Sequence, residues 1–340
     1  MKKRQNYILG IESSCDDTAA AVLCNDEVLS NYIANQEIHK AYGGVVPELA
    51  SRAHQSNIIP VVDRALSDAN ITKNMLSAIA YTNGPGLLGS LMVGSSFAKS
   101  ISLGLNIPLI AVNHMHAHLL ANFIKRQNMR KPKFPFLGVN ISGGHTQLIL
   151  VNDYFKMKLI GNTMDDAIGE AFDKCGKVLG FDYPAGPIID RLSSKGDPNK
   201  FSLPIAKIKG LNFSYSGLKT AFQNLVIKSK SIDNNFIENN IYDLCASLQK
   251  CLVESVTKKI ELAVEQFSLS RIAIGGGVSA NSGMRKEIEK KSNERGWEIY
   301  IPPIEYTTDN AAMIGIVGYY KFLSNKFDKF NVTPSPRFFI

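Results

Sequence analysis

Two stretches of the chain repeat one pattern of apolar and polar positions. In each, an apolar run of strand length leads into a turn of small polar residues and then into a second apolar run. The stretches are residues 8–23 and 136–151, and they align without a gap. Gly10, Ser14 and Thr18 fall on Gly138, Ser142 and Thr146. The repeat predicts two β-hairpins from an internal duplication, each followed by a third strand, near 28–33 and 155–160.

The duplication extends to a second kind of element. Strands predicted at 78–82 and 271–274 each lead into a glycine-rich turn, at 83–86 and 275–277, and then into a helix, at 88–103 and from about 281 onward. A strand, a glycine turn and a helix N-terminus together present backbone N–H groups to an anion. Two such turns and two hairpin turns in corresponding places predict an α/β fold of two lobes, with a phosphate-binding cleft between them.

The remaining periodicity is helical. Apolar spacing predicts helices at 165–179, ending at Gly180, at 242–267, and at 311–323 after Asp309 and Asn310 as its N-terminal cap. A length of 340 residues exceeds one typical domain. We expect a first lobe over 1–130 and a second over 131–340 with a helical insertion at about 161–260, the helix at about 310–325 packing back on the first lobe.

Composition narrows the class of protein. The chain is 45% hydrophobic and 20% charged, as ordinary globular proteins are. No stretch reaches the roughly 18 apolar residues of a membrane span, and the N-terminal residues 1–4, three of them basic, precede an apolar run too short for a secretory signal. Five cysteines without a CxxC pair fit a reducing cytoplasm and argue against a cysteine metal site. We expect a cytoplasmic protein with no membrane partner.

The net charge of +8 admits a polyanionic partner but also fits a lysine-rich surface.

Three of the six histidines lie within residues 113–118. On a helix, His114 and His118 share one face, so both imidazoles can reach one cation, whereas His116 points elsewhere. The same spacing would also be found in a histidine-rich surface turn, or where one imidazole makes its hydrogen bonds inside the core. The pair beside an apolar segment favours a metal site.

One class of metal enzyme is rejected by a single position. A zinc metalloprotease of the His-Glu-x-x-His type needs a general-base glutamate directly after the first histidine. Here that position holds Met115, which cannot take a proton.

The hairpin turns carry further candidates. Asp16 and Asp17, flanked by hydroxyl side chains, can hold a magnesium–phosphate unit or orient a nucleophile, although an ordinary Asp-rich turn would look the same. In the second hairpin, Ser142–Gly144 lets backbone N–H groups approach a ligand without side-chain obstruction. Asp309 precedes a helix, where aspartate commonly caps the N-terminus.

Motifs spread over nearly the whole chain resemble those of one enzyme family, in that family's order. They are residues 10–18 (GIESSCDDT), 43–54 (GGVVPELASRAH), 84–94 (GPGLLGSLMVG), 114–118 (HMHAH), 142–147 (SGGHTQ), 165–174 (DDAIGEAFDK), 183–187 (YPAGP), 213–220 (FSYSGLKT), 275–281 (GGGVSAN) and 308–313 (TDNAAM). The chain resembles the tRNA threonylcarbamoyladenosine transferases, the TsaD family, which has archaeal and eukaryotic counterparts. The histidine within SGGHTQ resembles the bacterial or organellar members.

The resemblance implies the actin, sugar-kinase and Hsp70-like (ASKHA, RNase H-like) fold. It implies transfer of the threonylcarbamoyl group from threonylcarbamoyl-AMP to N6 of adenosine 37 in tRNAs that read ANN codons. By motif position it assigns one divalent metal, Fe²⁺ with Zn²⁺ as the alternative, to His114, His118 and Asp309, and it places Asp16 near the reacting carbonyl as a candidate base. It assigns substrate contacts to Asn140, Ile141, Ser142, Gly143, Gly144, Asp173, Gly186, Asp190 and Asn281. It also implies a TsaB-like paralogue and a TsaE-like ATPase as partners.

Two positions depart from the family pattern. Asp17 stands where bacterial members often carry glutamate. Asn140 stands where archaeal members carry a tyrosine that can reach the metal, so no fourth protein ligand is assigned. Two rival functions remain: an ATP-dependent kinase or ATPase of the same fold, which would leave the histidine pair idle, and a non-catalytic scaffold paralogue, which in this family lacks that pair.

Overall fold

The structure is a computed structural model that describes residues 5–36, 39, 42–127 and 129–337. Residues 1–4, where a secretory signal was rejected from the sequence, lie outside this range. Contacts group the chain into two units, one of residues 1–132 with 302–340 and the other of residues 133–301. The division into folding domains at 130/131 stays a prediction.

The first unit is built on a five-stranded sheet in the order β3-β2-β1-β4-β5. Its strands are β1 (Tyr7–Glu12), β2 (Thr18–Cys24), β3 (Glu27–Ala34), β4 (Leu76–Gly84) and β5 (Leu109–Asn113). β1 pairs antiparallel with β2 and parallel with β4. The predicted hairpin, the third strand and the strand before the glycine turn are therefore confirmed, whereas β5 was not predicted.

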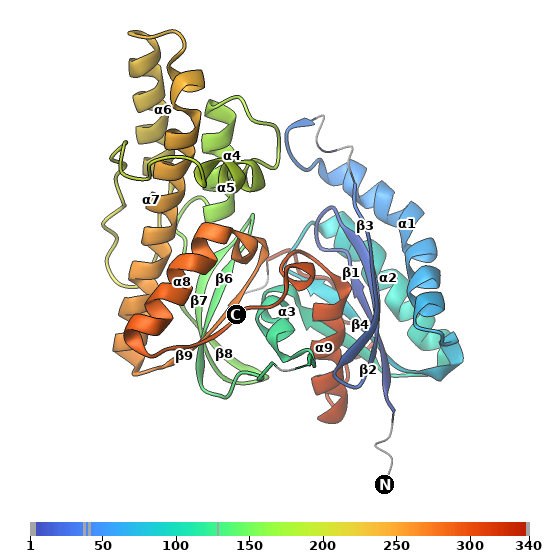
Figure 1. The fold of residues 1–340 in the computed structure, drawn as a ribbon. Helices are drawn as coiled ribbons and strands as arrows, with labels where there is room; N and C mark the ends of the chain where they lie inside the picture. The colour runs from blue at the N-terminus through green and yellow to red at the C-terminus, as the bar shows by residue number, and fades with distance from the viewer. Residues whose placement is uncertain (1–4, 37–38, 40–41, 128, 338–340) are drawn as a thin grey trace. The chain divides into compact units, whose positions relative to one another are not determined.

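Helices cover both faces of this sheet (Figure 1). On one face lie α1 (Pro47–Asp68) and α2 (Leu88–Leu105), and on the other lies α9 (Ala311–Leu323). The approach of α9 to β1 is so close that a β-carbon on Gly10 would lie 2.3 Å from the carbonyl oxygen of Ala311. This packing brings the residues just before α9 next to the end of β1.

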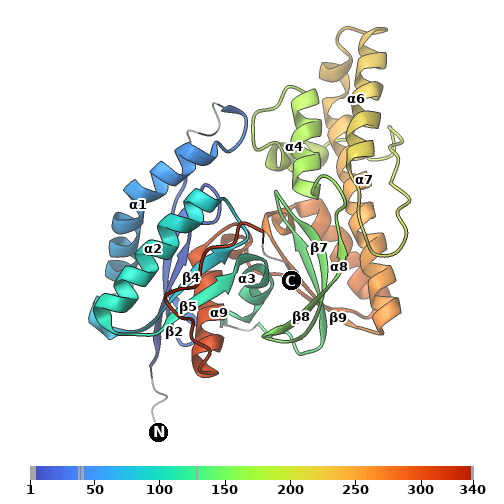
Figure 2. The same cartoon turned by 180° about the vertical axis from the view of Figure 1, so that it is seen from behind.

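The second unit repeats the first. Its sheet has the order β10-β9-β6-β7-β8, and its central hairpin is antiparallel while β9 runs parallel to β6. Figure 2 labels β7, β8 and β9 of this sheet. The strands are β6 (Phe136–Ile141), β7 (Thr146–Asp153), β8 (Lys156–Asn162), β9 (Arg271–Gly275) and β10 (Glu298–Tyr300). Each occupies the place of its counterpart in the first sheet, so the internal duplication is confirmed.

The helices of the second unit are α4 (Ile168–Val178), α5 (Gly186–Ser193), α6 (Ser216–Lys230), α7 (Phe236–Phe267) and α8 (Ser282–Arg295). α4 begins at Ile168 rather than at residue 165, because the Asp165 carboxylate accepts hydrogen bonds from the backbone N–H of Tyr215 (2.7 Å) and the hydroxyl of Ser216 (2.8 Å). Gly180 follows α4 with a φ of +83°, which confirms it as the residue that ends the helix. Among the described residues, no helix has both the length and the apolar character needed to cross a membrane.

Candidate metal centre and substrate turns

The helical spacing predicted for the histidine pair is present. The segment forms α3 (His114–Leu120), directly after β5. Its N-cap is Asn113, whose Oδ1 accepts hydrogen bonds from the backbone N–H groups of Met115 (2.9 Å) and His116 (3.1 Å). The cap starts the helix at His114, so His114 and His118 lie one turn apart on the same face.

The chain segment before α9 supplies a third side chain. The N-cap of α9 is Asn310, whose Oδ1 accepts from the backbone N–H of Met313 at 3.0 Å. Asp309 was expected to share this capping role. Because Asn310 caps the helix, the Asp309 carboxylate is available to point toward α3 instead.

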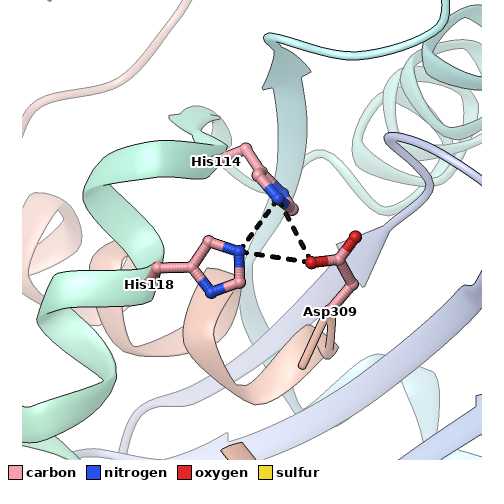
Figure 3. Close-up of side chains that lie close together, drawn as sticks. All are labelled: His114, His118 and Asp309. Carbon is pink, nitrogen blue, oxygen red and sulfur yellow. Dashed lines mark hydrogen bonds and ion pairs between the residues drawn. The ribbon is translucent and has the colours of Figure 1, made fainter. Parts of the chain in front are cut away.

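His114, His118 and Asp309 converge on one point (Figure 3). The Nε2 atoms of the two histidines are 3.1 Å apart, and Oδ1 of Asp309 lies 3.3 Å from Nε2 of His114 and 3.2 Å from Nε2 of His118. Two imidazole nitrogens and a carboxylate oxygen are a donor set that suits Zn²⁺ or Fe²⁺. The donor chemistry and the geometry therefore both fit one divalent cation.

Burial and charge set the protonation of this cluster. The side chain of His118 is 1% exposed and that of Asp309 is 28% exposed. Burial alone would lower the pKa of His114, but the negative charges of Glu12 and Asp309 outweigh it and hold that pKa well above its usual value. Burial lowers the pKa of His118. Burial would raise the pKa of Asp309, yet the charge and hydrogen bonds of the histidines hold it well below its usual value.

Glu12 is a member of this cluster that sequence reasoning missed. It is the last residue of β1 and is fully buried. Its Oε2 lies 3.0 Å from Nδ1 of His114 and accepts a hydrogen bond from the hydroxyl of Thr82 at 2.6 Å, while its Oε1 accepts from the backbone N–H of Ser14 at 2.6 Å. The feature of the sequence that could have indicated Glu12 is a single glutamate at the end of a predicted apolar strand.

Asp16 and Asp17 lie in the turn between β1 and β2, within the same unit as the histidines. The turn is held by His54 of α1, whose Nε2 lies 3.0 Å from the carbonyl oxygen of Cys15. Burial, followed by the negative charge of Asp16, raises the pKa of Asp17 to about 7. In the sequence, His54 stood out only as the last residue of the motif at 43–54, and no contact with this turn was predicted for it.

In the second unit, the turn Ser142–Gly144 joins β6 to β7, directly after the buried Asn140 and Ile141. Gly143 and Gly144 are exposed. The N-terminus of α4 packs against this turn, since the backbone N–H of Gly169 donates to the carbonyl oxygen of Ser142 at 3.3 Å. The exposed part of the turn therefore offers the backbone atoms of two glycines to a ligand, and α4 supports the turn from the protein side.

Of the other predicted substrate residues of this unit, Asp173, Asp190 and Asn281 each hydrogen-bond to the start of a helix, and Gly186 is the first residue of one. Oδ1 of Asp173 accepts from the backbone N–H of Ala185 at 2.8 Å, immediately before Gly186 begins α5. The carboxylate of Asp190, on α5, accepts from the backbone N–H (2.9 Å) and hydroxyl (2.8 Å) of Ser282 at the start of α8. Asn281 is the N-cap of α8. Side-chain contacts thus link α4 to α5 and α5 to α8.

Sequence comparison gives a uniform result. A family model described as tRNA N6-adenosine threonylcarbamoyltransferase, TsaD, matches residues 27–316. A relative of that name from Christiangramia forsetii is 56% identical and covers 99% of both chains. Relatives of the same name from Riemerella anatipestifer and Caldicellulosiruptor saccharolyticus are 52% identical (98% of both chains) and 46% identical (97% of both chains).

Comparison with solved structures supports the fold. The HypF protein of T. kodakarensis aligns with a TM-score of 0.60 at 13% identity, covering 96% of this chain and 49% of that one. Component A of the (R)-2-hydroxyglutaryl-CoA dehydratase of Acidaminococcus fermentans aligns with a TM-score of 0.53 at 16% identity, covering 93% and 98%. With the duplicated sheets, these likenesses confirm the predicted ASKHA α/β fold.

Proposed function

The chain belongs to the tRNA N6-adenosine threonylcarbamoyltransferase family, and from this premise we propose that it transfers the threonylcarbamoyl group of threonylcarbamoyl-AMP to N6 of adenosine 37 in tRNAs that read ANN codons. The observation that carries the proposal is the convergence of His114, His118 and Asp309. A kinase or ATPase would have no use for this cluster, and a scaffold would have no need of it.

The three residues of this cluster would hold one divalent metal, with Fe²⁺ as the proposed ion and Zn²⁺ as the alternative. When bound, the metal would supply a Lewis acid that polarises the carbonyl of the carbamoyl group. A set of three protein ligands is typical of catalytic sites, because it leaves coordination positions for substrate.

The turn Ser142–Gly144 would bind the threonylcarbamoyl group of the substrate. Its exposed glycines allow backbone N–H groups to donate to an oxygen on which negative charge develops. Asp173, Gly186, Asp190 and Asn281 are proposed as further substrate contacts, and the hydrogen bonds of Asp173 and Asp190 fix the backbone at the starts of α5 and α8. The AMP leaves as an anion when the new amide-like bond to N6 forms.

The adenine amine is a poor nucleophile, so the reaction needs orientation and a base. Asp16 is proposed to accept the proton from N6. Asp17 is the second candidate, because a carboxylate whose pKa is about 7 is well matched to proton transfer near neutral pH.

The proposed partners are tRNA, a TsaB-like paralogue and a TsaE-like ATPase, and the proposed compartment is the cytoplasm. The test combines the Fe²⁺-loaded protein with threonylcarbamoyl-AMP and an ANN-reading tRNA, with and without those two proteins, and follows modified adenosine by mass spectrometry. Product is expected in at least the complete mixture, and no product in any combination would contradict the proposed reaction. A tRNA whose adenosine 37 is replaced by guanosine is the matched control.

A further inference from the structure

We infer that Glu12 is a positioning residue for the metal centre, whose carboxylate fixes the tautomer and ring orientation of His114. The inference rests on the proposed role of His114 as a ligand. It is carried by the 3.0 Å contact between Oε2 of Glu12 and Nδ1 of His114, on the side of the ring away from the cluster.

The two ring nitrogens of His114 face different partners. Nε2 lies 3.1 Å from Nε2 of His118 and 3.3 Å from Oδ1 of Asp309, so it is the atom that can coordinate. Nδ1 lies 3.0 Å from the carboxylate of Glu12 and 3.3 Å from the hydroxyl of Ser14. The carboxylate accepts hydrogen bonds but donates none when ionised, whereas the hydroxyl can do either. Nδ1 must therefore carry the hydrogen, so Nε2 is the nitrogen that would give up its proton and offer its lone pair to a cation.

Glu12 is itself held rigidly. It ends β1, and its carboxylate accepts from Thr82 on the neighbouring strand β4 and from the backbone of Ser14. The residue is 0% exposed, so water does not compete for these oxygens. A buried carboxylate anchored on two paired strands can define the orientation of a ring more narrowly than a loop residue can.

The second imidazole lacks such a support. Nδ1 of His118 is buried and has no hydrogen-bond partner within the described part of the chain. Among the described residues, Glu12 is therefore the carboxylate that can orient this ligand pair through a Nδ1 atom. Loss of Glu12 should leave Nδ1 of His114 with only the hydroxyl of Ser14 at 3.3 Å, a group that can donate as well as accept and so does not select the coordinating tautomer.

The test measures Zn²⁺ affinity by competition with a chromophoric chelator, together with ¹⁵N NMR of the histidine side chains. Glu12→Ala is expected to weaken Zn²⁺ binding by about 10–100-fold, and Glu12→Gln by a smaller factor. The wild type should show a slowly exchanging Nδ1–H on His114, which Glu12→Ala should lose. The matched control is Asp328→Asn, since that carboxylate lies in the same unit and accepts from the backbone N–H of Ala111 at 2.8 Å.

The outcomes separate the inference from the function on which it rests. If wild type and His114→Ala bind Zn²⁺ equally weakly, the metal centre itself is wrong. If the wild type binds tightly, His114→Ala loses binding, and both folded Glu12 variants bind like Asp328→Asn with the Nδ1–H intact, the positioning role is wrong. The tautomer signal keeps the test independent of any general loss of stability.

Discussion

The backbone N–H of Gly169 donates to the carbonyl oxygen of Ser142 at 3.3 Å, and a β-carbon on Gly169 would lie 2.7 Å from that same oxygen. No side chain fits at this position unless the turn or the helix moves. The shape of the turn Ser142–Gly144 is therefore set partly by the first residues of α4.

Gly169→Ala is expected to displace this turn, destabilising the protein by about 1–3 kcal/mol through overpacking and weakening threonylcarbamoyl-AMP binding. The control is Gly217→Ala, because Gly217 is likewise the second residue of its helix but a β-carbon there would meet nothing within 4 Å. That variant should be neutral or stabilised by up to about 1 kcal/mol. Urea unfolding measures the stability of the two variants, and titration with threonylcarbamoyl-AMP measures their affinity. Equal stability and equal affinity in the two variants would contradict the role of Gly169 in shaping the turn.

His118→Ala should abolish stoichiometric metal binding and lower turnover by at least about 100-fold, because it removes one of three ligands. His116→Ala, on the same helix, should retain the metal, because His116 is not part of the cluster. The metal content of the two variants is measured after dialysis. Equal metal content in the two variants would refute the assignment.

Asp16→Asn should lower kcat by about 100-fold or more while metal content stays unchanged, because the amide cannot accept the proton from N6. Asp17→Asn is the matched change one position along the turn, and we expect it to cost less than about 10-fold. Single-turnover kinetics with saturating substrate provide the measurement. If Asp17→Asn lowered kcat more than Asp16→Asn did, Asp17 rather than Asp16 would be the base.

The pKa of Asp17, raised to about 7 by burial and by Asp16, makes stability depend on pH. In the metal-free protein the unfolded chain loses this proton above a pH of about 4, whereas the folded chain keeps it up to a pH of about 7. The unfolded state therefore binds fewer protons in that window, and the free energy of unfolding falls as pH rises through it. Asp17→Asn removes this effect, so at pH 8 the variant should be more stable than wild type by about 1–3 kcal/mol. Urea unfolding at pH 4 and pH 8 tests this, because the difference should be near zero at the lower pH.

The duplicated hairpins could be predicted because their strands are short apolar runs bounded by small polar turns. The i,i+4 histidine pair could be predicted for a similar reason, since helical spacing is local. In contrast, α1 carries Pro60 in its interior, which weakens any helical pattern read from sequence. The helix α5 has only eight residues, too few for its apolar spacing to be told from a chance pattern, α6 is polar, and β5 is too brief to stand out.

The contacts that assemble the site were beyond sequence reasoning. That Asn310 rather than Asp309 caps α9 depends on which side chain faces the helix N-terminus. Glu12 meets His114 because β1 and β5 flank β4 in one sheet, a relation that no local pattern contains. The family resemblance supplied Asp309 as a ligand, but it gave no indication of Glu12.

The return of α9 to the first sheet has a consequence for biosynthesis. This helix covers one face of β1, β2 and β4, and Asp309 directly precedes its cap. While the ribosome makes residues 133–301, the emerging first unit has its strands but neither the helix that covers them nor the third candidate ligand. The three candidate ligands are thus present together only near the end of translation, and a nascent chain carries an uncovered apolar surface until then, a period in which chaperone binding has a defined target.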